Sequence, residues 1–347
     1  MTASRGPRPT PAPARSGRST KKSSATTAPD APGPDDFVSE PVADIRTLGV
    51  VALKGDAGPA LEIVRAFAQA HPEVRVYLNG YLRPHAGRGL TVQPDAVLAT
   101  KVDALLSLGG DGTFLTAARL GHARGIPVLG VNLGRTGFLA DASLDNLASI
   151  LEDLMVRAYT LRHRLVLQVE QRRGAKTLFR DIALNEVAFA GLMGGQMAEL
   201  EVKANGQFLT TYRVDGLLVS TPTGSTAHAL SAGGPIIHPA THSLLLTPMN
   251  PASLSVRPLI LPDAMAIEVR HAGELATGGK KARASVNIFA DGRIHGALRS
   301  GDVVRITRHS DRLHIIRPRG ATYFEALRNK LGWTGDRDLR SGRATSG

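Results

Sequence analysis

The chain has 347 residues, enough for two domains, because a single hydrophobic core usually stops growing at roughly 250–300 residues. It contains no cysteine, which excludes disulfides, thiolate metal sites and a cysteine nucleophile and fits a cytoplasmic protein. No apolar run approaches the ~20 residues of a membrane helix, so we expect no membrane segment and no secretory signal. The net charge of +12 favours anionic partners, and the 4% aromatic content favours nucleotide phosphates over nucleic acid.

Residues 1–44 are rich in Pro, Ala, Ser, Thr and Arg and hold little that could form a core. We therefore expect a disordered tail. Its basic, acid-poor beginning is compatible with an organelle transit peptide, but it shows no convincing amphipathic helix. A dispensable tail, or a start assigned too far upstream, is the favoured interpretation.

The next part of the chain alternates between buried strands and helices. Apolar runs predict strands at 48–53, 74–78, 103–108 and 127–131, and helical spacing predicts helices from 59 to about 72, from 114 onward and at 144–158. Residues 79–93 are expected to form a loop. Alternating strands and helices predict a parallel sheet that binds ligands at the carboxyl ends of its strands.

From residue 160 the hydrophobic period changes to two, which is typical of strands. Strands are predicted at 162–170, 182–189, 200–203, 208–212, 216–220, 266–269, 284–289 and 303–307. Many short strands with few helices indicate a β-rich, sandwich-like domain. Residues 322–331 read as a helix that returns to the first domain. The predicted organisation is a tail (1–44), an α/β domain (45–145), a β-rich domain (146–318), a helix (319–333) and a frayed end (334–347).

The strand at 103–108 is followed by Gly109, Gly110, Asp111, Gly112 and Thr113, where a helix begins. A strand that breaks on glycines and restarts as a helix directs free N–H groups and a positive dipole end at one point, which suits a phosphate. A carboxylate inside such a loop suggests a metal-bound phosphate or a base beside an attacking oxygen. The alternative is a tight turn in which Asp111 caps the helix.

Polar residues also stand where other strands end. In the stretch 132–139, Arg135 could face a phosphate and Phe138 could face a flat ring. The alternative is that Arg135 is exposed to solvent and Phe138 is part of the core. Asn185 and Glu186 point to opposite faces of an extended strand, so both reach one ligand only at a strand end or bulge. Such a pair suits a ribose diol, although it is more often plain surface chemistry.

Two further stretches carry polar groups. Arg213 and Asp215 share one face of an extended segment. They could form a simple salt bridge, or Arg213 could contact a phosphate while the Asp215 carboxylate binds a base or an amide. The sequence leaves these two alternatives equally open. Residues 220–235 form a hydroxyl-rich loop with a short helix at 227–230, suited to phosphates and sugar oxygens, with ordinary helix capping as the alternative.

Together these stretches resemble the NAD kinase family. The motifs that carry the resemblance are GGDGT at 109–113, NLGRTGFLAD at 132–141, LNE at 184–186, DGLLVSTPTGSTA at 215–227, SAGGPIIHP at 231–239 and SLSVRPLILP at 253–262. The resemblance spans residues 48–333. GGDGT alone is shared with lipid kinases, and related loops with phosphofructokinases, so the LNE and STPTGSTA blocks are the specific ones.

The resemblance implies a homodimer or homotetramer that uses ATP and a divalent metal, Mg²⁺ in expectation, to phosphorylate the 2′-hydroxyl of the adenosine ribose of NAD. Asp111 would accept the proton, Gly112 and Phe138 would line the NAD site, and Asn185 and Glu186 would hold ribose hydroxyls. The remaining contacts to the dinucleotide would come from Asp215, Thr223, Thr226, Ala227, His228, Ala229, Leu230 and Ser231.

Three positions bear on the details of this resemblance. His228 stands where most members have tyrosine, and Arg293 where relatives often have glutamine after Asp-Gly. Arg213 stands where ATP-restricted members tend to have arginine, which favours ATP over polyphosphate. A lipid or sugar kinase sharing the glycine loop and a non-catalytic dinucleotide-binding protein are the alternatives.

The tail is expected to be dispensable, because it has too few apolar residues to offset the entropy of ordering, roughly 1–2 kcal/mol per residue. Limited proteolysis should leave a folded, active core that begins near residues 42–45. Loss of folding or of NADP formation on trimming to Asp44 would contradict this prediction.

Overall fold

The computed structural model describes residues 38–39, 44–87, 89–134, 137–190, 197–272, 275–277, 280–282, 286–319 and 322–333. Of the predicted tail at 1–44, residues 1–37 and 40–43 lie outside these ranges, and so do the predicted frayed end at 334–347 and Arg135. Val38–Ser39, inside the predicted tail, form a short strand instead.

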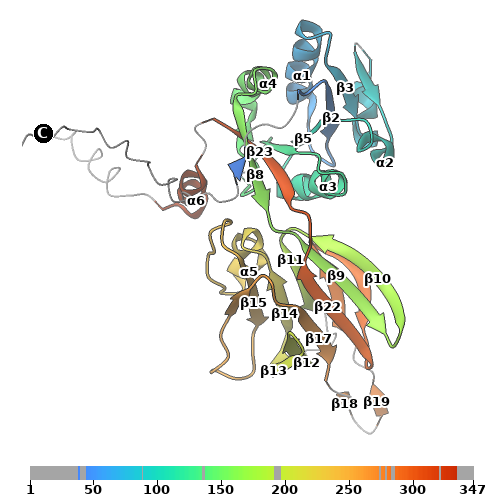
Figure 1. The fold of residues 1–347 in the computed structure, drawn as a ribbon, viewed down its shortest axis with the longest axis vertical. Coiled ribbons are helices and arrows are strands. Elements are labelled where there is room, and N and C mark those ends of the chain that lie inside the picture. The colour runs from blue at the N-terminus through green and yellow to red at the C-terminus, as the bar shows by residue number, and fades with distance from the viewer. Residues whose placement is uncertain are drawn as a thin grey trace, which may run out of the picture. The chain divides into compact units, whose positions relative to one another are not determined.

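The first sheet has nine strands in the order β1-β8-β23-β6-β5-β2-β3-β4, with β7 beside β6 (Figure 1). Its strands are β1 (Val38–Ser39), β2 (Thr47–Val51), β3 (Arg75–Leu78), β4 (Leu90–Val92), β5 (Ala104–Leu108), β6 (Val128–Asn132), β7 (Ala142–Ser143), β8 (Tyr159–Arg164) and β23 (Leu313–Pro318). The pairs from β23 to β4 are parallel, as predicted, whereas β1, β8 and β23 pair antiparallel. The carboxyl ends of the parallel strands therefore share one edge.

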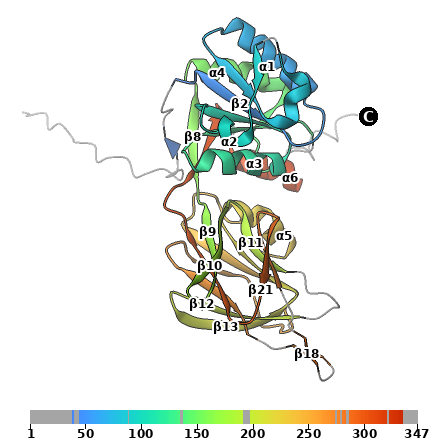
Figure 2. The same ribbon diagram turned by 90° about the vertical axis from the view of Figure 1, so that its right-hand side faces the viewer.

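Helices cover both faces of this sheet (Figure 2). They are α1 (Gly58–Ala70) and α4 (Leu147–Met155) on one face, and α2 (Asp95–Leu98) and α3 (Asp111–His122) on the other. All five residues of β5 are buried, because this strand lies between two others and under helices on both sides. Such a strand reads as a continuous apolar run, which is why the sequence identified it.

The second part of the chain is a sandwich of two six-stranded antiparallel sheets. The first contains β9 (Leu167–Arg173), β10 (Lys176–Ala183), β12 (Ala198–Ala204), β13 (Gln207–Val214), β17 (Ile267–His271) and β22 (Asp302–Arg308). The second contains β11 (Glu186–Ala190), β14 (Gly216–Ser220), β15 (Ser243–Met249), β16 (Leu259–Pro262), β20 (Val286–Ala290) and β21 (Arg293–Leu298). Apolar residues of both sheets form one core. The predicted fold class, parallel α/β followed by a β-rich sandwich, is confirmed.

Several predicted elements were wrong in extent. The loop at 79–93 contains a 3₁₀ helix, η1 (Gly80–His85), and the edge strand β4. The single strand at 162–170 is two strands, because β8 pairs with β23 in the first sheet and β9 pairs in the sandwich. A period of two is the same in both sheets, so it could not show where the chain passes from one to the other. Strands β15, β16, β21 and β23 were missed.

The last described helix, α6 (Tyr323–Leu331), matches the prediction at both ends. The Thr322 hydroxyl accepts a hydrogen bond from the Glu325 N–H at 3.2 Å, and Gly332 ends the helix with a φ of 64°. Between residues 44 and 333, no described helix combines the length and apolarity that crossing a membrane requires.

Gly130 in β6 is expected to resist substitution, because an added Cβ would lie 2.8 Å from the Ala140 Cα and 2.9 Å from the Phe114 ring. Gly130→Ala should lower the free energy of unfolding by about 1–3 kcal/mol, the usual cost of overpacking. Gly80→Ala is the matched control, since a Cβ there meets nothing within 4 Å. Urea unfolding measures both, and equal stabilities of the two variants would contradict the prediction.

Candidate active site

Asp111 is the first residue of α3, directly after the glycines that end β5. Its Oδ2 accepts a hydrogen bond from the Phe138 N–H at 3.0 Å, and its Oδ1 accepts one from the Leu139 N–H at 3.2 Å. The carboxylate is therefore fixed in orientation by the turn that follows β6. Asp111 does not cap α3, since the capping residue Gly110 precedes it.

The glycines around this carboxylate are needed for space. A Cβ on Gly137 would lie 1.9 Å from Asp111 Oδ1, so only glycine lets the turn approach the carboxylate. Gly109 has a φ of 149°, and a Cβ there would lie 2.6 Å from the Thr113 hydroxyl oxygen. Gly112 is exposed. The loop thus brings a carboxylate and open backbone to one point.

Phe138 is half-buried and lies beneath a lysine of the last helix. The Lys330 Nζ stands 3.7 Å from the centre of the Phe138 ring, in the geometry of a cation–π contact. Burial lowers the pKa of Lys330 to about 8, although Asp111 and Asp141 oppose this shift electrostatically. No sequence signal marked Lys330, because a single lysine in a helix is common.

Asn185 and Glu186 stand at the turn between β10 and β11, which meets the requirement that such a pair lie at a strand end. Asp291 holds this turn: its carboxylate accepts hydrogen bonds from the N–H groups of Leu184 (2.8 Å), Asn185 (2.8 Å) and Glu186 (3.3 Å). Arg119 of α3 contacts the same carboxylate at 3.4 Å. The turn is therefore linked to the helix that begins at Asp111.

Glu186 is 8% exposed, and its Oε2 has no hydrogen-bond partner within the described part of the chain. Burial, with a smaller contribution from the charge of Asp291, raises the pKa of Glu186 to about 7. Near neutral pH this carboxyl group is present in both protonation states, so it can accept a hydrogen bond or donate one.

The hydroxyl-rich segment packs directly on this turn. Thr221 donates from its N–H to the Asn185 carbonyl (2.9 Å) and from its hydroxyl to the Leu184 carbonyl (2.6 Å). A Cβ on Gly224 would lie 2.1 Å from the Asn185 carbonyl oxygen, so glycine permits the close approach. A 3₁₀ helix, η3 (Thr223–Thr226), and a short helix, α5 (His228–Ser231), follow, the second close to its predicted position.

The side chains in this segment do not all face one way. The Thr223 hydroxyl is buried without a hydrogen-bond partner among the described residues. His228 and Ser231 are exposed, whereas Thr226, Ala227 and Leu230 are partly buried. Ala229 is fully buried and packs into a small core with Ile237, so a ligand would meet its backbone and not its methyl group.

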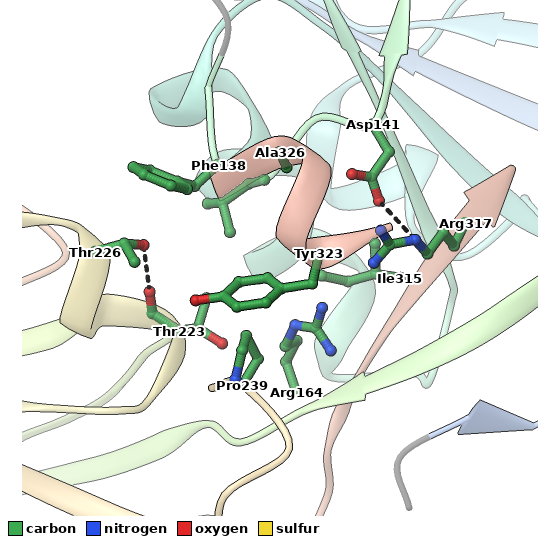
Figure 3. Close-up of a pocket in the computed structure, with 11 residues that line it drawn as sticks. Phe138, Asp141, Arg164, Thr223, Thr226, Pro239, Ile315, Arg317, Tyr323 and Ala326 are labelled. Atoms are coloured by element: carbon green, nitrogen blue, oxygen red, sulfur yellow. Dashed lines mark hydrogen bonds and ion pairs between the residues drawn. The ribbon is translucent and has the colours of Figure 1, made fainter. Parts of the chain in front are cut away.

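A pocket lies where Phe138, Thr223 and Thr226 meet the start of α6 (Figure 3). Its other lining residues are Leu139, Asp141, Arg164, Pro239, Ile315, Arg317, Tyr323 and Ala326. Figure 3 shows the Tyr323 ring extending toward the two threonines. The buried Tyr323 hydroxyl has no hydrogen-bond partner among the residues described.

The charges of this pocket are mainly positive. Arg317 lies 3.7 Å from the Asp141 carboxylate, and burial lowers the pKa of Arg164 to about 10, a value at which it stays protonated near neutral pH. Two guanidinium groups thus share one carboxylate, an arrangement that attracts anions. Sequence reasoning missed both arginines, since β8 and β23 meet only in the folded sheet.

Two predicted residues lie away from these groups. Arg213 pairs with Glu199 at 3.5 Å, and Asp215 accepts a hydrogen bond from the Asn250 amide at 2.9 Å, so each has another partner in place of the salt bridge that the sequence left open. Asp215 precedes β14, whose last residue, Ser220, is the ladder partner of Glu186. Arg213 belongs to β13 of the other sandwich sheet. Asp215 is five residues from Ser220, about 16 Å along extended chain.

Arg293 begins β21 and is exposed. Asp291 and Gly292 before it form the turn with positive φ values of 47° and 74°. In the sequence, the Asp-Gly pair served only to locate Arg293. In the structure, Asp291 of this pair contacts the candidate site through the backbone of residues 184–186.

A parallel sheet whose glycine loop presents a fixed carboxylate, beside a hydroxyl-rich loop and a basic pocket, defines a nucleotide-dependent phosphotransferase. Comparison with known proteins agrees. Residues 84–159 match the family model of the ATP-NAD kinase N-terminal domain, and residues 184–318 match that of the ATP-NAD kinase C-terminal domain.

Two NAD kinases show the extent of the similarity. That of Thiobacillus denitrificans is 39% identical over 236 residues, covering 68% of this chain and 78% of the relative. That of Geobacter metallireducens is 38% identical over 257 residues, covering 74% and 87%. The chain therefore belongs to the NAD kinase family. Its activity is ATP-dependent phosphorylation of NAD, and the lipid-kinase, sugar-kinase and non-catalytic alternatives are not favoured.

Two solved structures share the fold. Yeast NADH kinase complexed with NADH has a TM-score of 0.76 at 23% identity and covers 87% of this chain and 92% of its own. An NAD kinase from Archaeoglobus fulgidus in complex with ATP has a TM-score of 0.63 at 24% identity, covering 84% and 100%.

The raised pKa of Glu186 predicts a pH-dependent stability. The folded state holds this proton more tightly than the unfolded chain, so stability should fall as the pH rises from about 4.5 to about 7, by up to roughly 3 kcal/mol. Glu186→Gln should remove this part of the decline when urea unfolding is compared at pH 5 and pH 8. Glu199→Gln, on a glutamate whose side chain is 44% exposed, is the control, and identical pH profiles for wild type and Glu186→Gln would contradict the prediction.

Proposed function

We propose that the enzyme transfers the γ-phosphoryl group of ATP to the 2′-hydroxyl of the adenosine ribose of NAD, with Asp111 as the general base. The observation that carries this proposal is the Asp111 carboxylate, fixed by the Phe138 and Leu139 N–H groups beside an open glycine loop. Phosphoryl transfer depends chiefly on positioning and on neutralisation of charge, which such a loop supplies.

In the proposed step, the 2′-oxygen gives its proton to Asp111 and forms a bond to the γ-phosphorus. The bond from that phosphorus to the β,γ-bridging oxygen breaks, and its electron pair remains on ADP. The two N–H bonds stop the carboxylate from rotating, so its oxygens keep a fixed orientation toward the attacking hydroxyl.

The remaining binding roles follow the elements that carry the residues. Asn185 and Glu186 would hold ribose hydroxyls from the turn fixed by Asp291. Gly112 and Phe138 would line the NAD site from the first sheet. Thr223 and the segment from Thr226 to Ser231, with its buried Ala229, would contact the dinucleotide largely through backbone and hydroxyl groups. Arg293, which is exposed at the start of β21, would contact the dinucleotide from the edge of the site.

The divalent metal, Mg²⁺ in our proposal, would be carried by the triphosphate. Among residues 44–333, as far as they are described, no three His, Asp or Glu side chains converge on a metal position. Mg²⁺ usually keeps several waters and is held largely by substrate phosphates, so a dedicated set of protein ligands is not required. The metal would neutralise phosphate charge.

Arg213 and Asp215 would act on a bound nucleotide only in a neighbouring copy. Asp215 is five residues, about 16 Å along extended chain, from Ser220 beside this turn, and Arg213 is two residues further away along the chain, which is too far for either side chain to bridge. This supports a homodimer or homotetramer, in which Arg213 would favour ATP over polyphosphate. The cytoplasmic location remains a prediction.

Asp111→Asn keeps the shape of the side chain but removes the base. We expect kcat for NADP formation from NAD and MgATP to fall by about 10²–10⁴-fold, the usual contribution of a positioned base, with NAD affinity changing less than about threefold. Asp95→Asn is the matched control, since Asp95 also begins a helix and follows β4, three strands from β5. A loss below about tenfold in Asp111→Asn would mean that another group is the base.

A further inference from the structure

Lys330 belongs to the last turn of α6, far from the glycine loop in sequence but close to it in the fold. Its Nζ lies 3.7 Å from the centre of the Phe138 ring. The N–H of the same Phe138 donates to Asp111 Oδ2 at 3.0 Å. One residue thus connects the ammonium group to the carboxylate of the candidate base.

The ammonium group has no neutralising partner at contact distance. Within residues 322–333 and the other described segments, no carboxylate lies within 4.0 Å of its Nζ and no hydrogen bond to it occurs. Asp111 and Asp141 are the acidic groups that act on it electrostatically. A partly buried cation without an ion pair is costly, and an arriving anion would offset that cost.

We propose that Lys330 contacts the phosphoryl group during its transfer to the ribose, and the 2′-phosphate of the product. This inference rests on the function proposed above. The ammonium group is a compact charge with three donors, and the ring of Phe138 engages one side of it, which leaves N–H groups for phosphate oxygens. Its position beside Asp111 places it near the oxygen to which the phosphorus becomes bonded.

The neighbouring pocket supports this assignment. Arg164, Arg317 and Tyr323 line it beside Phe138, with Asp141 as the carboxylate among them. Lys330, on the ring of the pocket residue Phe138, adds a third cation next to this pocket. Asp111 and Asp141 both act on it electrostatically.

Three variants test the role of Lys330. Lys330→Met keeps the length and packing of the side chain without the charge, and Lys330→Arg keeps the charge. Lys101→Met is the matched control, because the Lys101 Nζ also lies over a ring, that of Tyr77 at 5.8 Å, on a different part of the first sheet. The measurements are kcat and KM for NADP formation and the affinities of each variant for NAD and for NADP by calorimetry.

We expect Lys330→Met to lower kcat by about 10²-fold, as removal of one donor to a developing charge does, with KM for NAD changed less than threefold. It should also weaken NADP binding at least tenfold while NAD binding stays within threefold. Lys330→Arg should recover a large part of both losses, and Lys101→Met should match the wild type.

The inference is overturned if Lys330→Met binds NADP and turns over like the wild type, or if Lys330→Met and Lys330→Arg lose the same amount of both. The second outcome would show that Lys330 only anchors α6 on Phe138. Failure of the proposed function is a different result, since wild-type protein would then form no NADP from NAD and MgATP.

Discussion

The geometry of the site depends on the two hydrogen bonds that the Asp111 carboxylate accepts from the Phe138 and Leu139 N–H groups. They join the helix that follows β5 to the turn that follows β6, and they set where the carboxylate points. The contact exists only because Gly137 leaves room for it. A charged group held by backbone donors needs no reorganisation when the reaction begins, which is the condition for efficient catalysis.

Helix α3 carries this geometry to the second part of the chain. Arg119 lies eight residues after Asp111, about 12 Å along the helix, and contacts Asp181 at 2.7 Å and Asp291 at 3.4 Å. Asp291 in turn holds the backbone of Asn185 and Glu186. The proposed base and the expected ribose contacts are thereby connected through helix α3, Arg119 and the Asp291 carboxylate.

Charge explains why the remaining side chains gather where they do. Arg164 and Arg317 come from β8 and β23, and Lys330 comes from α6, so three cations from distant parts of the sequence approach Phe138 with Asp141 as the nearby counter-charge. Such a surplus is costly without a bound anion and favourable once the phosphates of a nucleotide are bound. The site is therefore arranged for an anion larger than a single carboxylate.

The sequence by itself determined the fold class, the glycine loop with Asp111 and the polar turn at Asn185 and Glu186, because buried strands, glycines and strand ends leave local patterns. Tertiary structure alone decided what holds these groups. Asp291, Gly137 and Lys330 act on residues 26 to 192 positions away, and Arg213 pairs with Glu199 across a hairpin. No local period encodes which strands become neighbours, since β8 and β23 alternate like the strands of the sandwich, and only the closed sheets bring these side chains together.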